Sequence, residues 1–296
     1  SWREEASAVL MEVSGLRRTE DQLPASRLIG HLRCEEAPSA ERHQLERVHH
    51  ARYVDAIIAK SPRSGTVHLD PDTAMNPHTL NAALRPAGAG VLAPDLVMAG
   101  EIRRAFCNVR PPGHHAERGR AMGFCLFNNI AVAAAHALDH HGLERVAIVD
   151  FDVHHGNGTE DIFRDDERVL MVSTFQHPFY PHSGIEGRSA RMVNIPLPAY
   201  APPALFRAAV SEQWLPALEA FRPQMLFVSA GFDAHREDDM ASLALTEADY
   251  TWVTEALVAS AERHAHGRIV SMLEGGYALH ALGRSVAAHV KVLSGL

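Results

Sequence analysis

The sequence predicts an α/β protein of three layers, in which helices cover both faces of a mostly parallel central β-sheet. From residue 104 onward, short apolar runs rich in β-branched residues alternate with longer stretches of helical spacing. This alternation is typical of parallel sheets with crossover helices. No change in composition and no flexible linker separates the units within the 296 residues. We therefore expect one domain, residues 1–296, although a chain of this length could also hold two.

Six apolar runs are predicted as strands and three stretches as the helices between them. The strands are residues 105–109, 145–152, 169–175, 192–197, 225–233 and 268–277, and the helices are residues 128–142, 202–221 and 246–266. The first helix is rich in alanine and ends at Gly142, which suits a left-handed cap. The last begins at Thr246 with acidic residues behind it, a favourable helix start.

The first hundred residues are less regular. Residues 45–58 are predicted to be helical, and residues 61–78 form a long loop rich in proline, serine and aspartate. Residues 79–100 have helical apolar spacing but contain Pro86 and Pro94. Because proline lacks the backbone N–H and its ring clashes with the preceding turn, each proline should kink or interrupt that helix.

Charge and composition argue against several classes of protein. The net charge is -8 and no block of lysine and arginine occurs, so nucleic acid is not expected as a ligand. No apolar run approaches the roughly 20 residues of a membrane helix, and residues 1–13 carry acids where a signal peptide would be basic. Three scattered cysteines, Cys34, Cys107 and Cys125, do not make a disulfide framework. We expect a cytoplasmic protein.

The segment DFDVHHGNGT, residues 150–159, has the pattern of a metal site. Asp150, Asp152 and His154 alternate at the end of an apolar strand, where residues two apart share a face. Open α/β sheets build their sites at this end of the strands, and Asp233 ends another predicted strand. Asp152, His154 and Asp233 would make a three-ligand zinc site with a position open for water. An isolated Asp-x-His is more often a polar strand end. Here a second predicted strand also ends in aspartate and a glycine-flanked histidine pair occurs elsewhere, so a shared metal site is favoured.

Two further segments carry groups for proton transfer and hydrogen bonding. His114 and His115 follow a rigid Pro-Pro-Gly turn, and each imidazole needs a partner that fixes its tautomer. Asp150 and Asn157 are candidate partners. Tyr277 follows two glycines at a strand end and could donate a hydrogen bond to a developing oxyanion. Alone, this last pattern more often indicates a turn with a packed aromatic ring.

Taken together, five segments resemble the histone deacetylase family, which also includes acetylpolyamine amidohydrolases and acetoin-utilisation proteins. They are RPPGHHA, GFCLFNN, DFDVHHGNGT, SAGFDAH and LEGGY, and they cover roughly residues 45–290. The resemblance implies the arginase-type α/β fold. It also implies that Asp152, His154 and Asp233 hold zinc, that His114 and His115 handle protons, and that Tyr277 hydrogen-bonds the substrate carbonyl.

The resemblance further implies that His114 pairs with Asp150 and His115 with Asn157. Class I enzymes of the family tend to have aspartate at the position of Asn157. An asparagine there indicates the class II-like and bacterial branch. An uncharged partner should leave His115 less basic than aspartate would. We favour His115 as the general base and His114 with Asp150 as electrostatic support.

The substrate tunnel and a structural cation also follow from the resemblance. The residues implied to bind substrate are Gly123, Phe124, Tyr180 and Met240, together with Asp72 as an acid at the rim. A buried potassium ion would be held by oxygens of Asp150, Asp152, His154, Ser173 and Thr174, because oxygen ligands suit a hard cation.

The sequence departs from the family pattern at three places. Residues 21–33, DQLPASRLIGHLR, lack the histidine and glutamate of the family's opening segment. Pro86 and Pro94 are unexpected at their positions, and His182 stands where glycine is common. His182 should make the rim narrower or more polar. Other histidines on predicted helices, namely His49, His50, His136, His140, His141, His264 and His266, are expected to be satisfied or solvent-facing, and His155 to point away from the site.

The predicted function is zinc-dependent hydrolysis of the amide of acetylated amines, with N6-acetyl-lysine in proteins or peptides as the substrate. One alternative is an acetylpolyamine or other small-amide hydrolase. The resemblance disfavours it, because polyamine-specific relatives tend to carry longer insertions where the loop of residues 175–191 is short here. Another is a catalytically silent module that binds acyl-lysine. An oligomer is compatible with the sequence, which leaves the acyl length and the physiological metal open.

Overall fold

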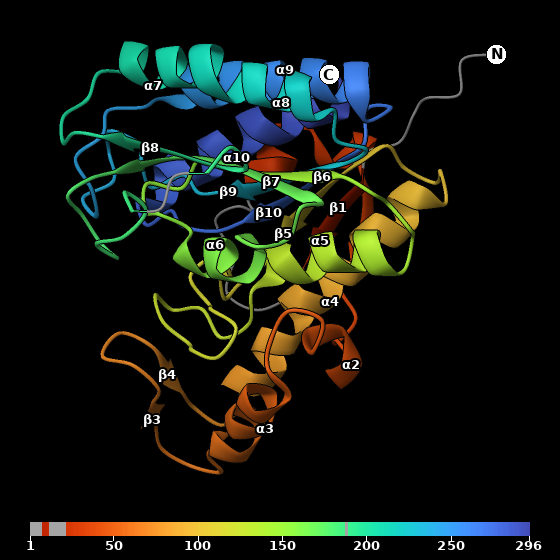
Figure 1. Cartoon of the computed structure of the whole chain (residues 1–296), viewed down its shortest axis with the longest axis vertical. Coiled ribbons are helices and arrows are strands. Elements are labelled where there is room, and N and C mark those ends of the chain that lie inside the picture. Colours follow the sequence, from red (N-terminus) through yellow and green to blue (C-terminus); the bar gives the residue numbers. More distant parts are fainter. Residues whose placement is uncertain (1–7, 12–21, 187–188) are drawn as a thin grey trace.

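The protein was analysed as a computed structural model that describes residues 8–11, 22–186 and 189–296. It confirms the three-layer α/β fold (Figure 1). Within the described residues, one parallel sheet has the strand order β2-β1-β5-β10-β9-β6-β7-β8. Its strands are β1 Ala8–Met11, β2 Arg33–Glu36, β5 Arg104–Asn108, β6 Val146–Asp150, β7 Val169–Gln176, β8 Met192–Leu197, β9 Leu226–Ala230 and β10 Ile269–Leu273.

Each of the six predicted strands is present, and β1 and β2 were not predicted. The sequence of β2, RCEE, has no apolar alternation and is largely exposed at the sheet edge, so no pattern marks it as a strand. Some sequence predictions concern residues 1–7, 12–21 and 187–188, which lie outside the described residues. They include most of the acidic start, the first residue of the segment 21–33 and part of the loop 175–191.

Helices lie on both faces of the sheet. They are α2 Arg42–Leu45, α3 Ala51–Lys60, α4 Thr79–Met98, α5 Asn129–Asp139, α6 Asn157–Phe163, α7 Pro203–Ala209, α8 Leu215–Phe221, α9 Glu247–His264 and α10 Leu279–Ser294, with a short 3-10 turn η1 at Ile29–His31. Figure 1 shows α7, α8 and α9 on one side of the sheet and α4, α5 and α6 on the other.

The strands supply apolar side chains to two separate cores because successive residues of a strand point to opposite faces. In β6, Val146 and Ile148 pack in the core that includes α4 and α5. Ala147 and Val149 pack in the core that includes α9 and α10. A strand buried on both faces therefore reads as a continuous apolar run, which explains why β6 was predictable.

Of the kink or interruption predicted at each proline of residues 79–100, the interruption is wrong, because α4 runs without a break through Pro86 and Pro94. Tertiary packing explains this result. Most of the helix is buried, and its glycines allow neighbouring backbone to approach: a Cβ on Gly88 would lie 1.8 Å from the carbonyl oxygen of Pro38, and one on Gly90 would lie 2.8 Å from that of Asn129. These contacts favour the helical path over the local preference of proline.

Two other segments differ from expectation. The predicted helix of residues 202–221 is divided by a π-helical turn, η2 Val210–Trp214, between α7 and α8. The predicted loop of residues 61–78 contains a small antiparallel pair, β3 Val67–His68 and β4 Ala74–Met75. None of the helices in the described part of the chain is both long and apolar enough to cross a membrane.

A buried histidine between α9, α10 and β10 should make folding stability depend on pH. His289 lies with Nδ1 2.7 Å from the hydroxyl of Thr254 and Nε2 2.8 Å from that of Ser271. Because the Thr254 hydroxyl already donates to the carbonyl of Tyr250, it accepts a hydrogen bond from Nδ1–H, and Ser271 donates to Nε2. The imidazole is therefore satisfied in its neutral form. Burial lowers the pKa of His289 to about 3.

The unfolded chain binds a proton at this histidine near pH 6.5, whereas the folded chain does not until about pH 3. The unfolded state therefore holds more protons in between, and stability falls as the pH is lowered through this window. We expect His289 to lower the free energy of unfolding by about 2 kcal/mol between pH 8 and pH 5. Urea unfolding of the wild type and of His289→Gln measures this contribution. Equal pH slopes in the two proteins would contradict it.

Candidate active site

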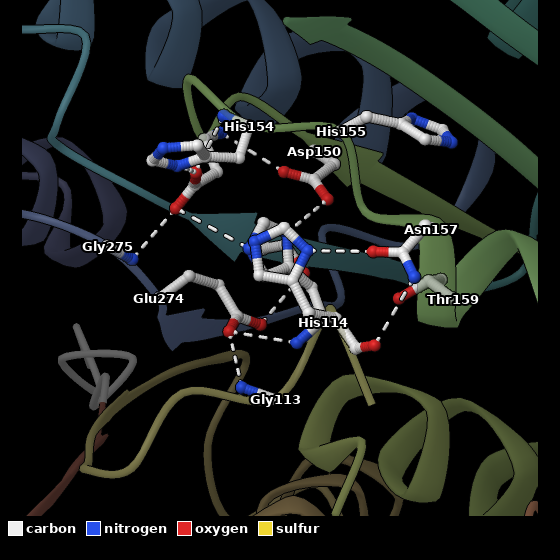
Figure 2. A network of polar contacts seen from close by, with 12 residues as sticks. Gly113, His114, Asp150, His154, His155, Asn157, Thr159, Glu274 and Gly275 are labelled. Atoms are coloured by element: carbon white, nitrogen blue, oxygen red, sulfur yellow. Dashed lines mark hydrogen bonds and ion pairs between the residues drawn. The ribbon is translucent and has the colours of Figure 1, made fainter. Parts of the chain in front are cut away.

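The site lies at the carboxyl ends of four neighbouring strands, β5, β10, β9 and β6. His114 and His115 follow β5, and Tyr277 follows β10. Asp233 follows β9, and Asp152 and His154 follow β6. Because parallel strands end at the same edge of a sheet, segments more than 100 residues apart converge there. Figure 2 shows the resulting network of polar contacts.

Asp152 and His154 do not lie on a strand, contrary to the sequence interpretation, since β6 ends at Asp150. They lie in the following loop, which the side chains themselves shape. The backbone N–H of Asp152 donates to Oδ1 of Asp150 at 3.1 Å, and that of His154 donates to Oδ1 of Asp152 at 2.9 Å. These turns, rather than the period of a strand, direct both side chains to the same point.

Asp152, His154 and Asp233 offer ligand atoms that all lie within 4.8 Å of one another. His154 Nδ1 is 3.0 Å from Oδ1 of Asp152 and 3.2 Å from Oδ2 of Asp233. All three residues are buried. Oδ2 of Asp233 receives no hydrogen bond from the described residues. Because the two buried carboxylates face one another, burial and the charge of Asp152 raise the pKa of Asp233 to about 6. Two carboxylates and one imidazole around a single point are a donor set that fits a divalent cation.

Two glycines allow the backbone to approach these carboxylates. A Cβ on Gly275 would lie 2.1 Å from Oδ2 of Asp233, and one on Gly231 would lie 2.1 Å from Oδ2 of Asp152. The missing side chain lets the N–H of Gly275 donate to Oδ2 of Asp152 at 2.8 Å (Figure 2). A glycine in LEGGY is thus required by close packing against the cluster.

His114 lies among carboxylates. Its Nδ1 is 2.9 Å from Oδ2 of Asp150, the predicted partner, and its Nε2 is 3.8 Å from Oδ2 of Asp152. Burial alone would lower the pKa of His114, but the charges of Asp150, Asp152 and Glu274 raise it well above its ordinary value. The structure therefore favours a charged imidazole at this position.

Glu274 was missed in the sequence although it lies inside LEGGY. Its carboxylate accepts hydrogen bonds from the backbone N–H of Gly113 at 2.7 Å and of His114 at 3.2 Å, and from the Ser229 hydroxyl at 3.0 Å (Figure 2). Burial raises its pKa to about 7. Its position directly after an apolar strand was the signal that could have identified it. Glu274 holds the turn that presents the two histidines.

His115 lies beside an amide instead of a carboxylate. Its Nδ1 is 2.8 Å from Oδ1 of Asn157, and the Nδ2 of Asn157 donates to Oε1 of Glu117 at 2.9 Å. Because Glu117 can only accept from that amide, Oδ1 faces His115 and Nδ1 must carry the proton. Nε2 of His115 is left with a free lone pair. Burial and the charges of His114 and His154 lower the pKa of His115 well below its ordinary value.

A cavity of about 220 Å³ leads to these groups. Its lining comprises Asp72, His115, Gly123, Phe124, His154, Phe179, Tyr180, Met240 and Tyr277. The structure thus brings every predicted substrate residue to one cavity, and it adds Phe179, whose ring stacks on His154 at 5.3 Å between centroids. His182 does not line it; this residue is exposed with φ +62°, a conformation that glycine adopts more easily.

Asp72 stabilises the rim. Its Oδ1 accepts hydrogen bonds from the Thr73 hydroxyl at 2.7 Å and from the backbone N–H of Gly123 at 3.0 Å. The hydroxyl of Thr73 in turn accepts from the N–H of Phe124 at 3.0 Å. Gly123 and Phe124 both have positive φ, 58° and 65°. The acid therefore holds a strained turn that exposes the Phe124 ring at the mouth.

Tyr277 is held by its own backbone. Its N–H donates to Oδ2 of Asp238 at 2.7 Å, and the same oxygen accepts from the N–H of Ala278 at 3.0 Å. Asp238 is buried and was not predicted. The ring lies under the guanidinium of Arg110, 5.7 Å from its centroid. Burial and the charges of Asp233 and Asp152 raise the pKa of Tyr277, so its hydroxyl stays protonated.

The residues predicted to hold a monovalent cation are also neighbours. Ser173 of β7 pairs with Asp150 of β6 in the sheet register, and its buried hydroxyl has no hydrogen-bond partner among the described residues. His155 lies apart, as Figure 2 shows: its ring is turned away from the network and bonds Glu160 through Nε2 at 2.6 Å.

Comparison with known proteins decides the family. The profile of the histone deacetylase domain matches residues 10–293. The chain belongs to the histone deacetylase family. It is 40% identical over 269 residues to a histone deacetylase-like amidohydrolase of Pseudomonas aeruginosa, an alignment covering 88% of this chain and 70% of the relative. It is 39% identical to a probable deacetylase of Archaeoglobus fulgidus, covering 78% of this chain and 66% of that protein.

A solved structure, that of the HDA15 HD domain, has the same fold as this family member. It superimposes with a TM-score of 0.90 at 32% identity, covering 98% of this chain and 90% of that one. The chain spans 54% of a further relative, the chloroplastic histone deacetylase 14 of Arabidopsis thaliana, at 40% identity. The family and the fold are thereby established, and this chain is a hydrolase of the histone deacetylase family.

Proposed function

We propose that this protein is a zinc-dependent deacetylase that hydrolyses the amide of N6-acetyl-lysine in proteins or peptides. One observation carries the proposal: His154 of the cluster with Asp152 and Asp233, a neutral His115 and the Tyr277 phenol all border the same cavity. A cavity of about 220 Å³ lined by aromatic rings suits an extended acyl-lysine side chain rather than a bulky ligand.

Asp152, His154 and Asp233 would hold the zinc ion. When bound, zinc polarises an amide carbonyl and makes water more acidic. Tyr277 donates its hydrogen bond to the carbonyl oxygen, where negative charge develops as the amide is attacked. Its raised pKa keeps that proton in place.

His115 takes the proton of the attacking water at Nε2 and later gives it to the leaving amine. The hydrogen bond from Nδ1–H to Asn157 keeps Nε2 available for this role. His114, charged beside Asp150, adds positive charge near the reacting groups without exchanging a proton.

Glu117 should influence the role of His115 as general base, because it fixes the orientation of the Asn157 amide. In Glu117→Leu the amide can rotate and donate to Nδ1 of His115, which would move the imidazole proton to Nε2. We expect kcat/KM to fall by about 10-fold, a fraction of what a general base contributes, with metal content unchanged. Glu117→Gln keeps an acceptor and is the matched control. Equal pH–rate profiles for the two variants would refute the role of Glu117.

We also propose a structural potassium ion bound by oxygens of Asp150, Asp152, His154, Ser173 and Thr174. The unpartnered hydroxyl of Ser173, a residue paired with Asp150 in the sheet register, supports it, since a hard cation prefers oxygen ligands. The cytoplasmic location, predicted from three scattered cysteines, and the organisation as one domain stay predictions.

A substrate panel tests the proposed function. The zinc-loaded protein should hydrolyse an acetyl-lysine peptide with a kcat/KM at least about 10-fold higher than for acetylated putrescine, a difference of about 1.4 kcal/mol in transition-state binding. The reverse preference would identify a polyamine-type amidohydrolase. No hydrolysis of any acetylated amine by a folded, metal-loaded protein would indicate a module that only binds acyl-lysine.

A further inference from the structure

A second cluster of metal-binding side chains lies between α4 and α5. It consists of Asp95 of α4 with His136, His140 and His141 at the end of α5. Helix α5 starts at the edge of the sheet that carries the active site, and Asn129 to His140 span about 16 Å along the helix. The cluster therefore lies at the other end of this helix. These histidines were expected to be satisfied or solvent-facing individually, and instead they gather around one carboxylate.

We propose that Asp95, His136, His140 and His141 form a second binding site for a divalent transition metal such as Zn²⁺. Each residue offers one ligand atom, and these atoms all lie within 4.8 Å of one another. The proposal is independent of the proposed function, because no residue is shared between the two clusters.

The helix geometry brings the imidazoles together. His136 lies in the last turn of α5 and His140, four residues later, is the C-terminal cap with helical dihedral angles. The two residues therefore occupy one face of the helix, and their rings stack with centroids 4.7 Å apart. The ring of His141 lies 5.3 Å from that of His136 and 4.9 Å from that of His140. The three rings thus surround a single point beside α4, which packs against α5 (Figure 1).

Asp95 occupies the fourth position. Its Oδ1 lies 2.6 Å from Nε2 of His136 and 2.7 Å from Nε2 of His141. This oxygen holds the two Nε2 atoms close together through hydrogen bonds. A metal ion bound there would take the place of the two Nε2 protons. Three imidazoles and a carboxylate form the four-ligand set of a closed tetrahedral site, and imidazole nitrogen favours zinc, nickel, copper or cobalt over magnesium and calcium.

Burial differs across the cluster in a way that suits binding. His136 is buried and fixed between neighbours, so it is preorganised. His140 is exposed, and its side chain makes no hydrogen bond to the described residues. A ligand without a hydrogen bond in the absence of metal gives an ion access from solvent and loses no hydrogen bond to the protein when it binds.

Arg47 should oppose metal binding. Its Nη1 donates to Nδ1 of His136 at 2.7 Å, which leaves Nε2 as the protonated nitrogen that faces Asp95. A metal on Nε2 would require the proton to move to Nδ1, where it would meet the guanidinium. Arg47 must then turn away. Because Arg47 is only half-buried, this movement is open to it, and its replacement should strengthen binding.

Counting bound zinc after equilibrium dialysis tests the proposal. We expect about two equivalents for the wild type and one each for His140→Ala and Asp233→Asn, with none for the double variant. His140 is exposed, so its removal leaves the core intact. His78→Ala, an exposed histidine at the other end of α4, is the matched control and should bind like the wild type.

The four proteins separate the two sites. If His140→Ala binds as much zinc as the wild type, the second site is refuted, whatever Asp233→Asn does. If Asp233→Asn binds as much zinc as the wild type and His140→Ala binds less, the second site stands and the active-site metal of the proposed function fails. Titration of Arg47→Gln with Zn²⁺ should give a Kd for this site about 10-fold lower than that of the wild type. Weaker binding in this variant would overturn the arrangement.

Discussion

Tyr277→Phe should lower kcat by about 10² to 10³-fold while the protein keeps its zinc. The size of the effect follows from the removal of one hydrogen-bond donor at the developing oxyanion. The ring of Tyr277 borders the cavity, and Asp238 holds the backbone on which it stands. Because these contacts do not involve the hydroxyl, phenylalanine should occupy the same position, and substrate binding should change little.

Steady-state kinetics on an acetyl-lysine peptide, together with zinc analysis, measures this effect. The control is Tyr200→Phe, which removes the hydroxyl of a tyrosine that is 82% exposed and should leave turnover unchanged. Turnover of Tyr277→Phe at the wild-type rate would remove the phenol from the mechanism. Loss of zinc together with turnover would instead give Tyr277 a structural role.

Removing the metal should have the larger effect. Treatment with a chelator is expected to lower kcat/KM by more than about 10³-fold, because a metal ion contributes several kcal/mol to the transition state. Zinc should restore the wild type but not Asp233→Asn. Asparagine can still accept the hydrogen bond from the N–H of Val153, so the variant keeps that backbone contact and loses one anionic ligand.

Asp239→Asn is the control, because Asp239 is exposed and six residues from the ligand. It should lose activity with chelator and regain it with zinc, as the wild type does. Thermal melting monitors the fold of both variants. Activity that survives complete removal of the metal would refute the zinc mechanism, and so would zinc reactivation of Asp233→Asn to the wild-type level.

The buried strands were predictable for a physical reason. In β6 and β9 both faces are covered, so every residue except the last of β6, Asp150, is apolar or small and the run is visible without knowledge of its neighbours. The edge strand β2 packs little of its surface, and nothing in RCEE indicates it. Helix α4 could not be predicted with certainty for another reason. Its two prolines disfavour a helix locally, and packing against other elements stabilises it.

The candidate site was accessible to sequence reasoning because its residues follow strands that end at one edge. Asp152, His154 and Asp233 could be grouped from their positions alone, yet a strand period was the wrong reason for the first two. The position of Glu274 after a strand marked it as a candidate, but the sequence did not show the roles of Glu117 and Glu274, because each acts on a segment distant in the chain: Glu274 on the turn at Gly113, for example, 161 residues earlier.

The sequence by itself determined the sheet, its crossover helices and the residue types that assemble at one edge, since these depend on local polarity and on the direction of parallel strands. Only the tertiary structure decided which nitrogen of His115 carries its proton and which side chains meet as partners. The proton of His115 is placed by an amide that Glu117 orients, and the histidines of α5 meet an aspartate of α4. Such contacts join side chains across the fold, where distance in space is unrelated to distance along the chain.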